Sequence, residues 1–204
     1  MQHKLNILKI MTKKIVSLFA ALLVASFSFA QTIWKSDNAH SNVKFSVAHL
    51  MISEVEGNFK VFDGQINSKN PDFTDADINF TVDVNSINTD NEMRDKHLKS
   101  DDFFNAEKFP QMKFKSTSFK KVSGNKYVLE GNLTVRDVTK KVKFDVIHRG
   151  IQKDGYGNVK AGFKATGSIN RIEYGLKWNV LTEGINTVGE DVAFVVNLEF
   201  SQAK

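Results

Sequence analysis

Residues 127–148 read YVLEGNLTVRDVTKKVKFDVIH, and the alternation of side chains in this stretch decides the fold. From Tyr127 to Val135 every second residue is apolar or small, with polar residues between them, and the same period returns from Val142 to His148. A period of two is typical of a β-strand that has one dry and one wet face. The stretch therefore predicts two neighbouring strands.

The same period recurs along most of the chain. Further strands are predicted at residues 43–49, 58–67, 78–84, 112–115, 161–169 and 192–200, which makes about eight in all. Turn signals at 63–64, 123–125 and 154–158 favour antiparallel neighbours. Because a sheet with a single apolar face must roll up or find a second layer, and closure removes exposed edges, we expect an all-β protein built as an antiparallel eight-stranded barrel.

One charged segment interrupts the strand pattern. Residues 91–110 read NEMRDKHLKSDDFFNAEKFP, which predicts a short helical insertion around residues 91–100 followed by the apolar pair Phe103 and Phe104. Such a segment is suited to form a lid or rim over whatever the sheet encloses. A solvated connection that only closes a long crossover is the alternative, since long connections are only sometimes functional.

Phenylalanine dominates the predicted inner face of the barrel. Six of these residues fall near the middle of six different strands: Phe45, Phe80, Phe114, Phe144, Phe163 and Phe194. The same face also carries small residues: Ser116, Ser118, Gly131, Ala161, Ala165 and Gly167. An eight-stranded barrel is either filled by its own side chains or holds one ligand, and the small positions favour a cavity. A solid Phe-rich core remains the alternative, because apolar alternation usually reflects packing.

The first thirty residues have the pattern of a secretory signal peptide. Lys13 and Lys14 precede the apolar run IVSLFAALLVASFSFA, which ends in small residues at Ala30. We therefore expect cleavage before Gln31, a mature domain at 31–204, and a periplasmic or secreted location. Removal of 1–30 takes away four Lys and no acidic residue, so basic residues fall from 28 to 24 against 23 acidic ones. The net charge of about +1 gives no indication of nucleic-acid binding.

Catalytic and metal-binding motifs are absent from the sequence. The chain lacks cysteine, zinc-type histidine spacing, a nucleophile elbow and phosphate-binding glycine loops. We accordingly predict no catalytic residue, no metal and no cofactor. His49 ends the inward row of its strand and Arg171 follows the inward Ile169. Each of these two side chains either bonds within the barrel or meets the polar end of a ligand at its mouth.

Five segments in order resemble a known family. They are HSNVKFSVAHL (40–50), GNFKVFDGQI (57–66), the run from 83 to 114 that contains SINTDNEMRDKHLKSDDFF, GNLTVRDVTKKV (131–142) and GSINRIEYGL (167–176). On these segments the chain resembles the YceI-like proteins over nearly its whole mature length. The resemblance implies an extended lipocalin-like barrel, exported in bacteria, whose interior binds isoprenoids, quinones or other long-chain amphiphiles. Asp137 and Lys141 depart from the family pattern, which commonly has Gly and Pro there, and this puts that turn in doubt.

The residues and the resemblance together predict a binding protein that sequesters or carries a long-chain amphiphile. The predicted hydrophobic pocket comprises Phe45, Val47, Phe80, Phe104, Phe114, Leu133, Phe144, Phe163, Ile169 and Phe194. The predicted polar mouth comprises His49, Arg94, His97 and Arg171. Transient membrane contact and a homodimer are compatible with this function. The alternatives are a lipid-modifying enzyme that uses His49 or His97 in the same cavity, and a structural barrel with a filled core.

Overall fold

The computed structural model describes residues 31–182 and 184–203, so the predicted signal peptide at 1–30 lies outside the described residues. The elements of the unit Gln31–Lys204 are β1 (Thr32–Ser36), η1 (Asn38–His40), β2 (Asn42–His49), β3 (Ser53–Phe59), β4 (Phe62–Ser68), β5 (Asp77–Asp83), η2 (Val84–Ser86), β6 (Ile87–Asn88), α2 (Glu92–Lys99), β7 (Gln111–Ser123), β8 (Lys126–Val135), β9 (Val138–Lys153), β10 (Val159–Asn170), η3 (Ile172–Tyr174), β11 (Leu181–Thr182), β12 (Ile185–Asn186) and β13 (Val188–Gln202). None of the helices in 31–182 and 184–203 combines the length and apolarity of a membrane span.

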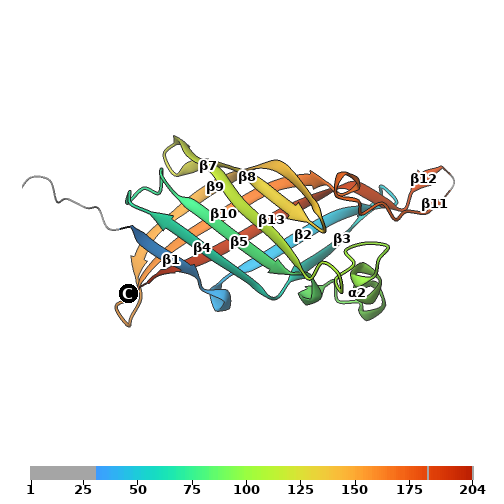
Figure 1. Cartoon of the computed structure of the whole chain (residues 1–204), viewed down its shortest axis with the longest axis horizontal. Helices are drawn as coiled ribbons and strands as arrows, with labels where there is room; N and C mark the ends of the chain where they lie inside the picture. Colours follow the sequence, from blue (N-terminus) through green and yellow to red (C-terminus); the bar gives the residue numbers. More distant parts are fainter. Residues whose placement is uncertain (1–30, 183, 204) are drawn as a thin grey trace, which may run out of the picture. The chain divides into compact units, whose positions relative to one another are not determined.

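The antiparallel sheet closes on itself (Figure 1). Its order is β1-β4-β5-β7-β8-β9-β10-β13, and β1 pairs again with β13 through Trp34 opposite Gln202. On the other half of the barrel β13 pairs with β2, β2 with β3, and β3 with β6. Closure leaves the main ladder without an open edge, which confirms the predicted all-β antiparallel barrel.

Three of the eight ring positions are strands with a break in the middle. β1 and β2 form one position interrupted by η1, β3 and β4 form the next with a break at Lys60 and Val61, and β5 and β6 form the third with η2 between them. The remaining positions are β7, β8, β9, β10 and β13. The eight positions follow one another in chain order, so neighbouring positions are joined by local connections, except where β13 closes the ring against β1 and β2. The predicted strand at 58–67 is therefore one broken strand, and β1 was missed by the sequence pattern.

The predicted turn at Asp63 and Gly64 is wrong, because Gly64 lies within β4. A Cβ added at Gly64 would lie 2.8 Å from Cδ2 of Phe80, whose ring covers it from the paired strand. Gly131 and Gly167 are covered in the same way by the rings of Phe114 and Phe144. These glycines are present for packing: each lets a phenyl ring lie against the barrel wall.

The two ends of the barrel differ. At one end lie α2, the β2–β3 turn, the β8–β9 turn and the β11–β12 hairpin, as the connectivity requires and as Figure 1 shows. At the other end the β4–β5 loop inserts Phe73, only 1% exposed, into an aromatic cluster. We call the first end the α2 end. The aromatic cluster, which consists of Trp34, Phe73, Phe119, Tyr127, His148, Phe163 and Phe200, fills the second end.

Candidate functional site

Two apolar cavities lie one behind the other inside the barrel. The outer cavity, at the α2 end, has a volume of about 80 Å³ and is lined by Phe45, Val47, Phe59, Ile87, Leu98, Phe103, Phe104, Met112, Val135, Ile169, Arg171, Leu176, Val188, Val192 and Phe194. The inner cavity has a volume of about 130 Å³ and is lined by Val43, Ile78, Phe80, Val82, Met112, Lys113, Phe114, Leu129, Leu133, Val135, Phe144, Ala165, Ile169, Phe194, Val196 and Leu198. Only apolar atoms face either cavity.

Most of the predicted pocket residues line these cavities. Phe45, Val47 and Phe104 lie on the outer cavity, Phe80, Phe114, Leu133 and Phe144 lie on the inner one, and Ile169 and Phe194 lie on both. Phe163 lies outside both. Its ring stacks on His148 at 4.8 Å between centroids and packs edge-on against Phe73 at 5.1 Å. Phe163 faces inward, as strand alternation predicts, but Phe73 from the β4–β5 loop fills the part of the lumen next to it.

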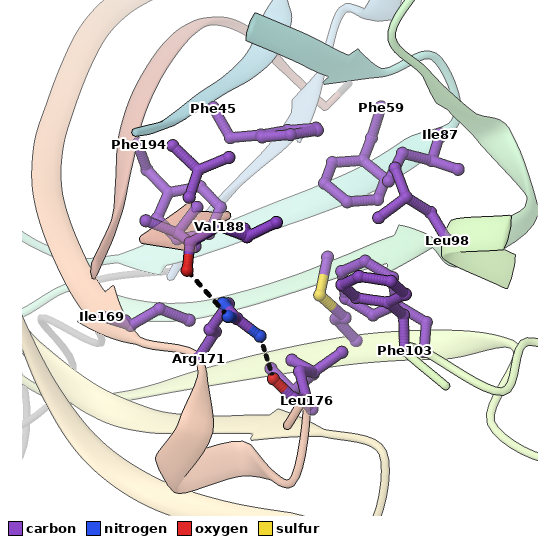
Figure 2. Close-up of a pocket in the computed structure, with 15 residues that line it drawn as sticks. Phe45, Phe59, Ile87, Leu98, Phe103, Ile169, Arg171, Leu176, Val188 and Phe194 are labelled. Atoms are coloured by element: carbon purple, nitrogen blue, oxygen red, sulfur yellow. Dashed lines mark hydrogen bonds between the residues drawn. The ribbon is translucent and has the colours of Figure 1, made fainter. Parts of the chain in front are cut away.

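The segment 91–110 supplies part of the outer cavity wall. Leu98 near the end of α2, and Phe103 and Phe104 after the helix, line the cavity. Figure 2 shows Leu98 and Phe103 at this wall. The ring of Phe104 meets Phe59 edge-on at 6.1 Å, and Phe103 lies 5.3 Å from the ring of Trp178. The apolar pair singled out in the sequence thus lies at the α2 end of the lumen.

Two polar anchors hold this segment on the barrel. Asp95, 9% exposed, accepts hydrogen bonds from the backbone N–H and the hydroxyl of Thr89 at 2.9 and 2.6 Å, while Arg94 donates to the Thr89 hydroxyl and carbonyl at 2.7 Å each. From the β8–β9 turn, Arg136 donates to the Phe103 carbonyl at 3.0 Å and to the Asp101 carboxylate at 3.1 Å. Arg94, predicted at the polar mouth, lies on neither cavity and has this anchoring contact instead.

The predicted histidines also lie outside the cavities. The Nε2 of His97 is 2.8 Å from Asp102 Oδ2, and its ring meets Trp178 edge-on at 4.9 Å. His49 pairs with Val188 across β2 and β13, directly beside a residue of the outer cavity wall. Both histidines therefore lie at the α2 end of the barrel, and neither lines one of the two cavities.

Arg171 is buried at the wall of the outer cavity, and its guanidinium bonds the surrounding backbone. Nε donates to Gly189 O at 2.7 Å, Nη1 to Trp178 O at 3.0 Å and also to Leu176 O, and Nη2 to Val188 O at 3.1 Å. Figure 2 shows the bonds to Leu176 and Val188. Burial lowers the pKa of this guanidinium.

These four carbonyls use four of the five N–H groups of Arg171. Its side chain therefore joins the loop after β10 to the start of β13 and presents its apolar stem to the cavity. Arg171 lies at the α2 end, where the sequence analysis predicts a polar mouth, and most of its N–H donors bond backbone carbonyls.

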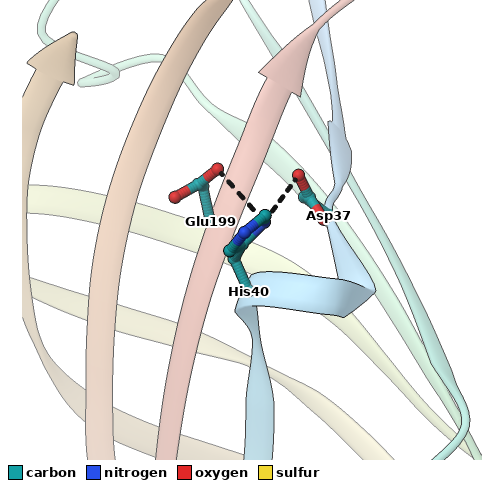
Figure 3. A group of neighbouring side chains, drawn as sticks. All are labelled: Asp37, His40 and Glu199. Carbon is teal, nitrogen blue, oxygen red and sulfur yellow. Dashed lines mark ion pairs between the residues drawn. The ribbon is translucent and has the colours of Figure 1, made fainter. Parts of the chain in front are cut away.

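A second polar cluster lies where β1 breaks into β2 (Figure 3). His40 Nδ1 is 3.2 Å from Asp37 Oδ2 and 3.9 Å from Glu199 Oε1, a donor set that could hold a metal ion. The ammonium of Lys160 already contacts both carboxylates, at 2.6 Å to Asp37 and 3.3 Å to Glu199. Its hydrogen bond lowers the pKa of Asp37, while the same bond raises the pKa of Lys160. A metal ion would have to displace this internal cation.

Several wall residues carried no signal in the sequence. Leu98, Leu176 and Val188 come from a helix end, a loop and the first residue of a strand, where no period of two operates. Phe59 lies on the predicted strand 58–67 but was not assigned to the pocket. Met112, Val135 and Leu129 lie on predicted inward rows, so their positions follow from the alternation alone.

The β8–β9 turn that departs from the family pattern is formed. Val135 pairs with Val138 across a connection of two residues, with Arg136 in the left-handed region at φ 55°. Lys141 lies within β9, exposed and paired with Asn132. The two departures, Asp137 and Lys141, therefore leave both the turn and the ladder intact.

Comparison with known proteins agrees with this fold. The profile described as YceI-like domain matches residues 34–200. Among curated proteins, UPF0312 protein SA2479 of Staphylococcus aureus (strain N315) is 40% identical over 167 residues, which cover 81% of this chain and 95% of the relative.

Solved structures give the same relationship. The Campylobacter jejuni YCEI protein is 31% identical, with a TM-score of 0.66 and coverage of 77% of this chain and 90% of that one. Burkholderia cenocepacia BcnA is 25% identical, with a TM-score of 0.67 and coverage of 80% and 98%. A polyisoprenoid binding domain from Saccharophagus degradans shares the fold at a TM-score of 0.61 but only 14% identity, covering 83% and 98%. With the profile matching most of its length and a barrel of the same architecture, the chain belongs to the YceI-like family.

Proposed function

We propose that this protein is an exported binding protein that sequesters or carries an isoprenoid, a quinone or another long-chain amphiphile, with the hydrocarbon tail inside the barrel. The observation that carries the proposal is the lumen itself: two successive cavities whose exposed walls consist of apolar atoms only. A wall of this kind offers no partner to a polar group, so the enclosed part of the ligand is hydrocarbon.

Similar proteins support the same class of ligand. The Saccharophagus degradans domain with this fold is named for polyisoprenoid binding, and the chain belongs to the family by its own sequence match. Burial of each methylene from water is worth about 0.8 kcal/mol, which favours a tail over a compact polar solute. For a lipid taken from a bilayer this gain nearly vanishes, and contacts with the head group then decide selectivity.

The head group would remain at the α2 end. The polar groups beside the outer cavity there are the fifth N–H of Arg171, which bonds none of the four carbonyls, the imidazole of His49, and the His97–Asp102 pair next to Trp178. None of these groups faces the cavity with a polar atom, so a head group bound there would lie outside the lumen, at its rim.

Transient membrane contact is part of this proposal, with the bilayer as the partner. The β2–β3 turn exposes Met51 and Ile52 (72% and 85% exposed), and the adjacent hairpin exposes Leu181 (70%). The two tips are joined by a hydrogen bond from Leu50 N to Thr187 O, one residue before the cavity-lining Val188. Exposure of a hydrocarbon tail to water costs about 0.8 kcal/mol per methylene. A tail that passes from the bilayer into the barrel at this apolar edge avoids that exposure.

Native mass spectrometry of the mature protein purified from a bacterial envelope tests the proposed function. We expect a co-purifying hydrophobic mass, which chloroform extraction removes and added prenyl alcohol or quinone restores. A bare chain that takes up neither ligand would favour the structural barrel with a filled core. N-terminal sequencing of the same material tests export, with Gln31 as the expected first residue.

A lipid-modifying enzyme remains the alternative, with His49 or His97 as the candidate group. Incubation with bound lipid followed by product analysis separates the two functions. Turnover that disappears in His97→Ala or His49→Ala while binding persists would favour the enzyme. For a carrier, both variants release the lipid unchanged.

A further inference from the structure

The two cavities meet at a ring of four shared residues. Met112, Val135, Ile169 and Phe194 line both the outer and the inner cavity, so they form the boundary between them. We call these four residues the waist. Three of them are nearly buried: Val135 is 1%, Met112 7% and Ile169 9% exposed.

Met112 and Phe194 come from opposite walls of the barrel. Met112 lies on β7 and Phe194 on β13, and these strands are four positions apart in a ring of eight in either direction. Positions four apart in such a ring face each other across the lumen. Val135 lies on β8, the strand next to Met112, and Ile169 lies on β10 diagonally across from Phe194, two residues beyond its direct partner Gly167.

The four waist residues differ in how readily they move. Val135 and Ile169 are branched at Cβ and therefore stiff at χ1. The Phe194 side chain sits at a crowded position, because its residue pairs with Phe45 on one side and with Gly167, under the Phe144 ring, on the other. Methionine is unbranched, with three rotatable bonds, and fills irregular space adaptably. The waist therefore opens most easily at Met112.

The cavity volumes limit how long a hydrocarbon tail each cavity can hold by itself. A dry cavity of roughly 150 Å³ accommodates benzene, so each cavity here has room for roughly one five-carbon isoprene unit. A longer tail cannot stay in the outer cavity alone. It must pass between Met112 and Phe194 to reach the inner cavity, which ends at the aromatic cluster.

We propose that Met112, opposed by Phe194, is a gate between the two cavities and determines how long a hydrocarbon tail the barrel accepts. The inference rests on the proposed function and names the residue that sets its specificity. A short tail binds with Met112 in place, whereas a long tail binds only with the thioether side chain turned aside.

Binding of prenol, geraniol and farnesol, which carry one, two and three isoprene units, tests the gate, because one unit fits the outer cavity and a second must pass Met112. We expect Met112→Phe to leave prenol binding within about twofold of wild type and to weaken geraniol and farnesol binding by roughly tenfold or more. Met112→Ala should shift the preference toward geraniol and farnesol. Phe194→Leu, which widens the waist from the opposite wall, should act like Met112→Ala and covers the case in which Met112→Phe fails to fold. Met93→Ala, at a methionine that is 82% exposed on α2, is the matched control.

If folded Met112→Phe and Met112→Ala changed the binding affinity for all three alcohols by the same factor, the gate would be overturned. Crystals pressurised with xenon provide a readout that needs no lipid: wild type should show two separate xenon sites and Met112→Ala one continuous site. The same xenon pattern in both proteins would also overturn it. If wild type binds no alcohol, the proposed function fails and the selection of tail length fails with it, whereas merged xenon sites in Met112→Ala would still show that Met112 separates the two cavities.

Discussion

The ring of Phe45 lies over the backbone of Gly57 on the paired strand, where a Cβ at Gly57 would clash with its Cζ. The methyl group of Thr89 closes the same spot from the other side, 2.9 Å from that Cβ position. Thr89 in turn binds Asp95 and Arg94 of α2. Because Gly57 has no side chain, the ring of Phe45 in the outer cavity wall and the methyl group of Thr89, which anchors α2, can pack against the same backbone position.

Gly57→Ala should therefore destabilise the protein by about 1–3 kcal/mol through over-packing, although alanine normally favours a strand over glycine. Urea unfolding measures the change. Phe45→Leu should recover part of the loss in the double variant, because it removes the clashing ring. Gly155→Ala is the control: nothing lies within 4 Å of a Cβ there, so its stability should change by less than about 0.5 kcal/mol. A Gly57→Ala variant as stable as Gly155→Ala would contradict the packing argument.

Phe144→Glu should abolish tail binding, since it places a carboxylate on the inner cavity wall. The matched control is Lys143→Glu, which puts the same side chain on the exposed face of the same strand. Tail binding is read from native mass spectra with added farnesol, and circular dichroism checks folding. Ligand retention in a folded Phe144→Glu variant would show that the tail does not occupy the inner cavity.

Arg171→Met should cost about 3 kcal/mol or more of stability, because four buried or part-buried backbone carbonyls lose the guanidinium donor, and of these Val188 O keeps a second donor in Asn179 Nδ2. Arg171→Lys should recover only part, since an ammonium has three donors and no planar fork. Thermal unfolding compares both with Arg149→Met, a loss of charge at an exposed position. If Arg171→Met were no less stable than Arg149→Met, the guanidinium would be free to serve a ligand instead.

Stability should fall as the pH drops below 7, and His148 should account for part of the fall. Its Nε2 is buried without a hydrogen-bond partner among the described residues, its ring packs against both Phe73 and Phe163, and burial lowers its pKa from 6.5. Lys121 acts in the same direction.

Since the unfolded chain then binds the proton more readily than the folded one, folding free energy is lost as pH falls from about 6.5 to the lowered folded-state pKa. Urea unfolding between pH 5 and 8 should show a shallower pH dependence for His148→Phe than for wild type. Parallel curves would assign the acid sensitivity to other groups.

Ile52→Asp combined with Leu181→Asp should slow the transfer of a fluorescent prenyl lipid between vesicles several-fold, because both exposed side chains lie at the proposed bilayer contact. Equilibrium affinity for farnesol in solution should not change, since neither residue lines a cavity. Tyr156→Asp, 93% exposed at the opposite end of the barrel, is the control. Unchanged transfer together with a shift from dimer to monomer in sedimentation would instead make this edge a contact between two copies.

The sequence by itself determined the barrel and the orientation of its strands. Alternation reports which side of a strand a residue faces, a local property, so the pattern of neighbouring residues was enough to assign Phe45, Phe80, Phe144 and their equivalents to the interior. The charged segment after residue 90 likewise carried a local helix signal, which α2 confirms.

Only the tertiary structure decided how that interior is filled. Phe163 faces inward as expected, yet Phe73 from a distant loop occupies the space in front of it. Leu98 and Leu176 reach the cavity from segments without a period, and Arg171 meets four carbonyls that lie up to 18 residues away. These contacts depend on where the loops lie once the ring of strands has closed. The alternation of a residue with its immediate neighbours contains no information about which distant loop packs against it.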